Sequence, residues 1–195
     1  MTNITDLNKF SEKEIATFEH AADELNRGIN FDKNLALFEK EAEQNNVYAL
    51  KVLGFLYSVG VFNPDDPSKS ALIDISSKES EEKAKSYFKK AKDLGSVHAM
   101  LWFAMHDCIY ISHATEENLE EGETLPTAQD FIAAEALALK TIEESKKESS
   151  DCPDGLIECL YYWIARLYDS KNPNNPIYDE KKAAYWDKLY KESEK

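Results

Sequence analysis

Apolar residues recur along the chain at helical spacing. From Ala49 to Tyr57 they lie three and four residues apart, and the same spacing returns from Leu160 to Tyr168. Apolar residues at this interval line one face of an α-helix. The first set is Ala49, Val52, Leu53, Leu56 and Tyr57, and the last set is Leu160, Trp163, Ile164, Leu167 and Tyr168. The recurrence predicts an internal repeat built from helices.

A middle copy of this pattern is degenerate. It begins with Ala99, Trp102 and Phe103, but His106 and Asp107 stand where the other copies have leucine and tyrosine. A small residue follows the central apolar position of every copy, and these residues are Gly54, Ala104 and Ala165. Because a small side chain lets a neighbouring helix approach closely, we expect these three positions to be helix-packing contacts.

The stretch before each of the first two copies is also repeated. Phe38 aligns with Phe88, and the two stretches end at Asn45 and Gly95. Asparagine and glycine both accept the left-handed conformation that closes a helix. A short turn should therefore reverse the chain at each of these residues, which gives helical hairpins.

The prolines separate the periodic stretches and do not interrupt them, as expected of helices. The first helix should begin close to Glu12, with Ser11 as its N-cap, Glu14 completing a capping box and Phe10 packing against Ile15. We expect helices near 12–27, 32–44, 47–59, 79–94, 97–110, 127–147, 155–169 and 178–193. With no competing strand pattern, the sequence predicts an all-α fold.

Composition and charge narrow the functional classes. Hydrophobic residues make up 43% of the 195 residues and charged residues 31%, which is typical of a globular chain that can bury a core. The formal net charge is −14, so the chain repels phosphate backbones and direct nucleic-acid binding is not expected. The same charge attracts cationic proteins, although an acidic excess can also serve solubility alone.

No apolar run has the length of a signal peptide or of a membrane span. We therefore expect a soluble cytoplasmic protein without membrane insertion. Cys108, Cys152 and Cys159 form no paired framework, and a reducing compartment would leave them as structural thiols.

Two segments resemble the Sel-like repeat family, whose αα-hairpins are related to tetratricopeptide repeats. They are "KKAKDLGSVHAM", with Ala91, Gly95 and Ala99, and "ALKVLGFLY", with Ala49, Leu53, Gly54, Leu56 and Tyr57; Ala84 matches as well. The chain departs from the family in its longer repeat spacing and in a third hairpin that keeps only its second helix.

The resemblance implies a right-handed αα-hairpin solenoid that holds a protein partner in a superhelical groove, without common catalytic residues. On this basis residues 1–195 form a single repeat domain. It would consist of an N-terminal helix within 1–31 and degenerate repeats over 32–195, with insertions near 60–78 and 111–126.

Residues capable of chemistry do not converge. The glycines are scattered and form no phosphate-binding loop, so no nucleotide or other cofactor is expected. His98, His106, Cys108 and His113 share one stretch, but His106 and Cys108 face different sides of a helix, and His106 and His113 would lie about 10 Å apart. We expect neither a metal site nor a catalytic centre here, and a partly buried structural role for His106.

Two groups of residues are candidates for partner binding. The acidic group lies in the insertions and comprises Asp65, Asp66, Glu116, Glu117, Glu120, Glu121 and Glu123. The aromatic group lies near the C-terminus and comprises Tyr161, Tyr162, Tyr185, Trp186 and Tyr190. The acidic residues could equally be a solvated loop, and the aromatic residues could equally fill the core.

Three functions compete on this basis. The first is a bacterial immunity protein that neutralises a basic toxin, suggested by small size, irregular repeats with long insertions and strong acidity. The second is a general adaptor or scaffold, which would more often have regular repeats and further domains. The third is an enzyme, which the scattered chemistry disfavours. We expect a non-enzymatic protein-binding role.

Overall fold

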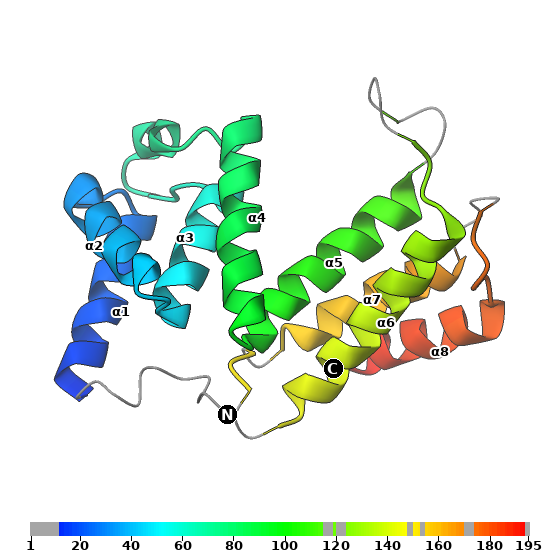
Figure 1. The fold of residues 1–195 in the computed structure, drawn as a ribbon. Coiled ribbons are helices and arrows are strands. Elements are labelled where there is room, and N and C mark those ends of the chain that lie inside the picture. The colour runs from blue at the N-terminus through cyan, green and yellow to red at the C-terminus, as the bar shows by residue number, and fades with distance from the viewer. Residues whose placement is uncertain are drawn as a thin grey trace. The chain divides into compact units, whose positions relative to one another are not determined.

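The computed structural model describes residues 12–114, 119, 124–147, 150–152, 155–169 and 174–193, with side chains described from residue 15 onward. It is 75% helix, and the described residues contain no strand, which confirms the all-α prediction (Figure 1). The elements are α1 (Glu12–Asn26), α2 (Phe31–Glu43), α3 (Val47–Val59), the 3-10 helix η2 (Pro67–Leu72), α4 (Lys78–Asp93), α5 (Val97–His113), α6 (Ala128–Ser145), α7 (Ile157–Asp169) and α8 (Glu180–Ser193).

The eight predicted α-helices all form, with ends within a few residues of the predicted ones. Helix α1 begins at Glu12 as predicted, whereas its proposed cap Ser11 and the apolar Phe10 lie outside the described residues. The 3-10 helix was not predicted. It begins with Pro67, whose fixed φ suits the first position of a helix.

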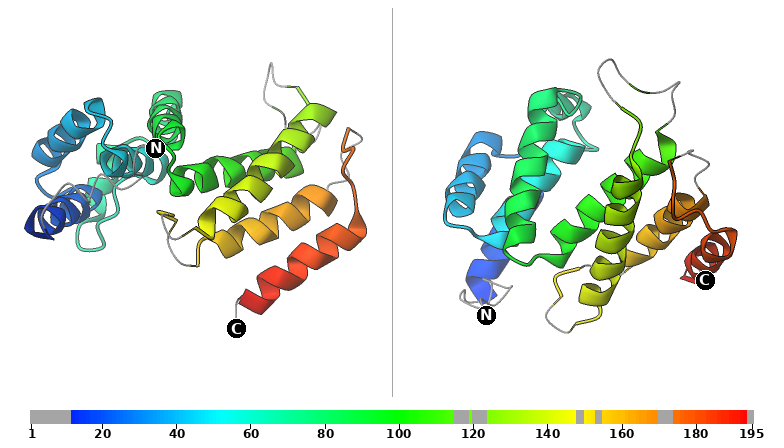
Figure 2. Two further views of the ribbon diagram at one scale, coloured as in Figure 1. Left: turned by 60° about the horizontal axis from the view of Figure 1, so that its bottom comes forward. Right: turned by 45° about the vertical axis from the view of Figure 1, so that its right-hand side comes forward.

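The chain divides into two compact units, Met1–Ala99 and Met100–Lys195. In unit 1, α3 packs extensively against α4, α2 packs on α3, and α1 packs on α2. In unit 2, α7 packs extensively against α8, and α6 packs on α7 (Figure 2). A single repeat domain and a right-handed superhelix stay predictions.

The turns that close α2 and α4 have the same hydrogen bonds. The amide of Asn45 donates to the Ala42 carbonyl (3.1 Å), and that of Asn46 donates to the Glu41 carbonyl (3.1 Å). The equivalent bonds run from Gly95 to Lys92 (2.9 Å) and from Ser96 to Ala91 (3.0 Å). Asn45 and Gly95 both have positive φ, as predicted, and this pattern is the Schellman motif.

The residue after each left-handed position starts the next helix. The Asn46 side chain accepts from the amides of Tyr48 and Ala49, and the Ser96 hydroxyl accepts from the amide of Ala99. Both side chains therefore act as N-caps. The structure thus repeats one helix–turn–helix connection at the two places where the sequence predicted it.

Gly54 provides a close contact between α3 and α4. A Cβ built on Gly54 would lie 2.9 Å from Cε1 and Cζ of Phe88, which is fully buried. Only a residue without a side chain lets the Phe88 ring lie against the α3 backbone. The predicted role of Gly54 is confirmed, and Ala104 and Ala165 are fully buried as well.

The degenerate middle copy buries a different face of its helix. Within α5, Trp102, Phe103, His106 and Asp107 are only partly buried. The buried side chains from this helix in the core of unit 2 are Leu101, Ala104, Cys108 and Ile111. They meet buried residues of α6 and α7, including Phe131, Leu160 and Ile164. The pattern breaks at His106 because the α5 face that enters this core runs through Ala104 and Cys108 instead.

No helix among the described residues is long and apolar enough to cross a membrane.

Candidate protein-binding surfaces

The acidic candidates in the second insertion, Glu116, Glu117, Glu120, Glu121 and Glu123, lie outside the described residues. Asp65 and Asp66, in the first insertion, can be placed. The Asp65 carboxylate pairs with Arg27 at 3.0 Å, and its amide donates to Asn63 Oδ1. Asp66 Oδ1 accepts from the amide (3.2 Å) and the hydroxyl (2.6 Å) of Ser68. Both side chains therefore support the local fold.

The hydrogen bond from the Ser68 hydroxyl is the main reason that the pKa of Asp66 is lowered. Asp66 is thus an anionic N-cap of η2, a position that favours negative charge. The predicted role of Asp65 and Asp66 in partner binding stays a prediction. The sequence alone did not reveal that both carboxylates make intramolecular contacts that stabilise the insertion.

The insertion after α3 is anchored to the turn between α1 and α2. The amide of Phe62 donates to the Asn26 carbonyl at 2.8 Å, and the Asn63 side chain donates to the Arg27 carbonyl at 2.8 Å. Gly28 has φ +64, and a Cβ there would lie 2.9 Å from Cδ1 of Leu72. These contacts hold the insertion against the turn between α1 and α2, within unit 1.

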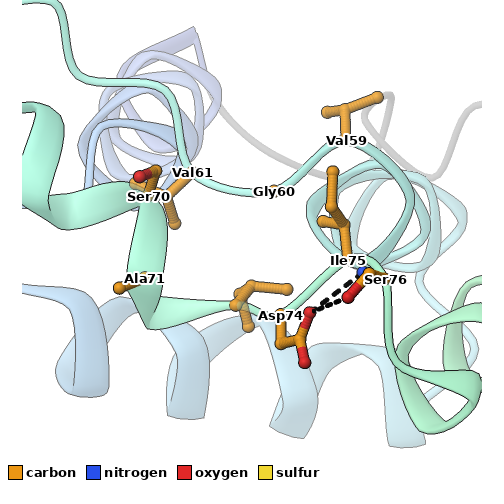
Figure 3. Close-up of a pocket in the computed structure, with 9 residues that line it drawn as sticks. Val59, Gly60, Val61, Ser70, Ala71, Asp74, Ile75 and Ser76 are labelled. Carbon is orange, nitrogen blue, oxygen red and sulfur yellow. Dashed lines mark hydrogen bonds between the residues drawn. The ribbon is translucent and has the colours of Figure 1, made fainter.

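This anchored insertion forms an apolar hollow, which we call the 59–76 hollow. It measures about 480 Å³ and lies where the chain runs from the end of α3 through η2 to the start of α4 (Figure 3). Its lining residues are Val59, Gly60, Val61, Ser70, Ala71, Ile73, Asp74, Ile75 and Ser76. Sequence reasoning missed this site, although the apolar runs "VGVF" and "ALIDI" inside a polar insertion could have indicated it.

The aromatic candidates gather along α7 and α8, and we call them the α7–α8 ring cluster. Its members are Tyr161, Tyr162, Tyr185, Trp186 and Tyr190. The ring centroids of Tyr161 and Trp186 are 5.5 Å apart, and those of Tyr162 and Tyr190 are 5.4 Å apart. The structure therefore brings together all five residues that the sequence singled out.

The ring cluster is partly a surface and partly core. Tyr185 is 57% exposed, whereas the other four members are partly buried. Tyr161 and Trp186 pack against the buried core of unit 2. The core interpretation thus holds for Tyr161 and Trp186, whereas an interface role of the exposed Tyr185 stays a prediction.

Beneath the ring cluster, Tyr168 joins three helices through polar contacts. Its hydroxyl donates to the Glu135 carboxylate of α6 and accepts from the Trp186 indole of α8. Lys182 lies 3.5 Å from Glu135 and above the Tyr168 ring. Burial, with the Glu135 carboxylate, raises the pKa of Tyr168 far above its ordinary value, so the phenol stays a neutral donor.

A cation lies at the edge of the same cluster. Arg166 pairs with Asp187 at 3.4 Å, and its guanidinium lies 5.2 Å from the Tyr162 ring centroid. Arg166 Nε and Glu158 Oε2 are buried and have no hydrogen-bond partner within the described part of the chain. The helix α7 therefore carries polar groups of both signs next to its aromatic residues.

Cys108, His106 and His113 of α5 make separate contacts. Cys108 is fully buried, and this burial raises the pKa of its thiol to about 12, so it is not a thiolate nucleophile near neutral pH. His106 is partly buried and stacks on Trp102, with its Nδ1 3.7 Å from the Asp107 carboxylate. His113 packs instead on Trp163.

A second hollow of about 310 Å³ borders His106, Asp107, Tyr110 and Asp130. The Asp130 carboxylate is engaged there in a capping box with Thr127, which lowers the pKa of Asp130. Across the described ranges, no group of three His, Cys, Asp or Glu residues is placed to hold a metal ion.

Comparisons with protein-family models, curated proteins and solved structures find no match. The resemblance to Sel-like repeats thus rests on the residues quoted from the sequence.

Proposed function

We propose that this chain is a non-enzymatic protein-interaction module that acts as a bacterial cytoplasmic immunity protein. Its partner would be a cognate toxin or effector with a basic surface. The proposal is supported by the strong negative charge of the chain and by the way in which its aromatic residues are displayed.

The α7–α8 ring cluster is the observation that carries the proposal. Its rings already lie against one another, so binding would immobilise few additional side-chain rotamers. Tyrosine and tryptophan with one packed face and one accessible edge are typical anchors of protein interfaces. Tyr185 offers the most exposed ring of the cluster, and Arg166 beside Tyr162 adds a hydrogen-bonding cation.

The net charge of −14 supports a cationic partner. Complementary charge accelerates diffusional encounter and excludes like-charged competitors, whereas aromatic contacts mainly slow dissociation. An inhibitor that must capture a basic toxin rapidly would use both features. A nucleic-acid target would be repelled by the same field.

Co-expression with the product of the adjacent gene tests the proposal. Cells should survive expression of that product only when the intact chain is present. The variant Tyr185→Ala is matched by Ile132→Ala, which removes a different exposed side chain of unit 2. We expect Tyr185→Ala, and not Ile132→Ala, to weaken protection. If the adjacent product is harmless on its own, the immunity function is wrong and a general adaptor takes its place.

A further inference from the structure

The 59–76 segment presents apolar side chains to solvent from a fixed backbone. Phe62 is 76% exposed, Val59 63% and Ile75 50%, and Leu72 is exposed as well. Grouped apolar side chains are uncommon on the surface of a protein that binds nothing there. Hydrogen bonds from Phe62 and Asn63 to the Asn26 and Arg27 carbonyls hold the start of the segment in place.

The shape of the hollow depends on a glycine. Gly60 has φ +78, and a Cβ at this position would lie 3.0 Å from Cγ2 of Ile75. Val59 and Ile75 stand at one end of the opening, and Val61, Ser70 and Ala71 stand at the other (Figure 3). A space of about 480 Å³ with this lining suits apolar side chains from an incoming segment.

Asp74 supplies the charge of the hollow. Its Oδ1 accepts from the hydroxyl (2.6 Å) and the amide (3.0 Å) of Ser76, as drawn in Figure 3. These hydrogen bonds, the hydroxyl first, lower the pKa of Asp74, and no cation contributes to that lowering. The carboxylate is exposed at the rim as an anion that a ligand cation could pair with.

The surrounding charge restricts the ligand further. Residues 59–76 contain Asp65, Asp66 and Asp74 but only one cation, Lys69. Within a chain of net charge −14, this segment attracts cations and repels anionic peptides, anionic lipid and a second copy of the chain. Charge complementarity thus favours a basic protein segment.

We propose that the 59–76 hollow binds a basic, extended segment of a partner protein, taking its aliphatic side chain between Val59, Val61 and Ile75 and its lysine or arginine at Asp74. This inference rests on the proposed protein-binding function. It adds a second partner contact, in unit 1, to the α7–α8 ring cluster in unit 2. The partner segment would alternate cationic and aliphatic residues. Its aliphatic side chains then share the strand face that enters the hollow, and the long, flexible side chain of a neighbouring lysine or arginine can reach back to Asp74 at the rim.

Peptide titrations of the full-length protein test the inference. The probe is an acetylated and amidated Lys-Ile-Lys-Ile-Lys peptide, with Lys-Ser-Lys-Ser-Lys and Glu-Ile-Glu-Ile-Glu as matched controls, followed by amide chemical shifts. We expect the first peptide to shift amides within 59–76 and to bind at least about 10-fold tighter than either control, because only it supplies both charge and apolar contact.

Three variants define the contacts. Ile75→Ser should weaken Lys-Ile-Lys-Ile-Lys about 10-fold through lost apolar contact. Asp74→Asn should weaken it about 3-fold and flatten its dependence on salt between about 50 and about 300 mM. Ile132→Ser, which alters an exposed side chain of unit 2, should leave the affinity unchanged.

Several results would overturn the inference. Equal binding of Lys-Ser-Lys-Ser-Lys would mean that charge alone attracts the peptide, and unchanged affinity of Ile75→Ser would place binding elsewhere. No shift within 59–76 at millimolar peptide would exclude the site. Self-association in sedimentation velocity that Ile75→Ser abolishes would make a second copy the occupant.

The two proposals can fail separately. If Ile75→Ser and Asp74→Asn protect cells as wild type does and the peptide does not bind, the hollow is not a contact, while the immunity function stands. If the peptide binds as expected but the adjacent gene product is harmless, the hollow stands and the immunity function is wrong.

Discussion

The 59–76 hollow and the α7–α8 ring cluster expose apolar side chains in different ways. The hollow lies on an insertion that exposes Val59 and Ile75 while burying Val61, and its anchors are hydrogen bonds to the turn after α1 and the close contact at Gly28. The ring cluster lies on two helices, and Trp186 and Tyr161 are also packed against the core of unit 2. Substitutions of the exposed hollow residues, such as Ile75, should therefore report on binding alone, whereas substitutions in the cluster mix binding with stability.

The largest expected effect is a loss of stability at the contact between α3 and α4, the two helices that flank the hollow. Helices α3 and α4 flank the 59–76 segment and meet where Gly54 touches the buried Phe88 ring. Gly54→Leu should lower the free energy of unfolding by more than about 3 kcal/mol, because overpacking at a buried contact forces both helices apart. Chemical denaturation measures this loss.

The matched control is Gly54→Leu in a Phe88→Ala background. Removing the ring opens space for the leucine, so the cost of Gly54→Leu should fall markedly in that background. An equal cost in both backgrounds would show that Phe88 is not the group that the new side chain meets.

The next effect is a difference in stability loss between substitutions of Trp186 and Tyr185, two neighbouring members of the ring cluster. Trp186→Ala should destabilise the protein by about 2–3 kcal/mol, because it removes a ring packed on the core and the indole donor to Tyr168. Tyr185→Ala should cost less than about 1 kcal/mol, since Tyr185 is 57% exposed. Similar losses for the two variants in thermal unfolding would mean that the cluster is uniformly core or uniformly surface.

The third effect is that the free energy of unfolding depends on pH through Cys108, in the core of unit 2. Burial raises the pKa of Cys108 from about 9 to about 12, so the thiol favours the folded state below pH 9 and loses that contribution as pH rises toward 12. Between pH 9 and 10 the stability should fall by roughly 1 kcal/mol from this group, because the unfolded thiol loses its proton over this interval and the folded thiol keeps it. Urea unfolding of wild type and Cys108→Ala at both pH values measures the slope.

Cys108→Ala should be less stable at neutral pH but should show a flatter slope over this interval. The hollow is expected to behave oppositely, because the lowered pKa values of Asp66 and Asp74 make their contributions disappear as pH falls below about 4. If the alkaline slope is the same in Cys108→Ala, the thiol is not the titrating group.

The smallest expected effect is on the stability of hollow variants. Ile75→Ser should change the free energy of unfolding by less than about 0.5 kcal/mol, because Ile75 is exposed. Asp66→Ala, which removes the N-cap of η2, should cost more and serves as the comparison. A loss from Ile75→Ser above that of Asp66→Ala would show that the hollow is part of the core.

The sequence was sufficient for the parts of the fold that local rules determine. Helical spacing located the eight α-helices, Asn45 and Gly95 marked their turns, and Gly54 marked a close contact. The aromatic candidates did come together, because Tyr161, Tyr162, Tyr185 and Trp186 lie on neighbouring faces of two packed helices.

Features that depend on contacts distant in sequence could not be predicted. The hollow-lining Val61 packs against Gly28 in the turn between α1 and α2, a contact that no periodicity encodes. The pairing of Asp65 with Arg27 spans 38 residues, so no local sequence pattern could predict it. Likewise, the burial of Trp186 depends on the packing of α8 on α7.

The association kinetics of the purified chain with the purified product of the adjacent gene test the central claim most directly. If this protein is an immunity protein, the two should form a stoichiometric complex whose association slows steeply as salt increases. Tyr185→Ala should then speed dissociation while leaving association nearly unchanged. The absence of a complex at micromolar concentrations in low salt would contradict the claim that this acidic chain neutralises that partner by binding it.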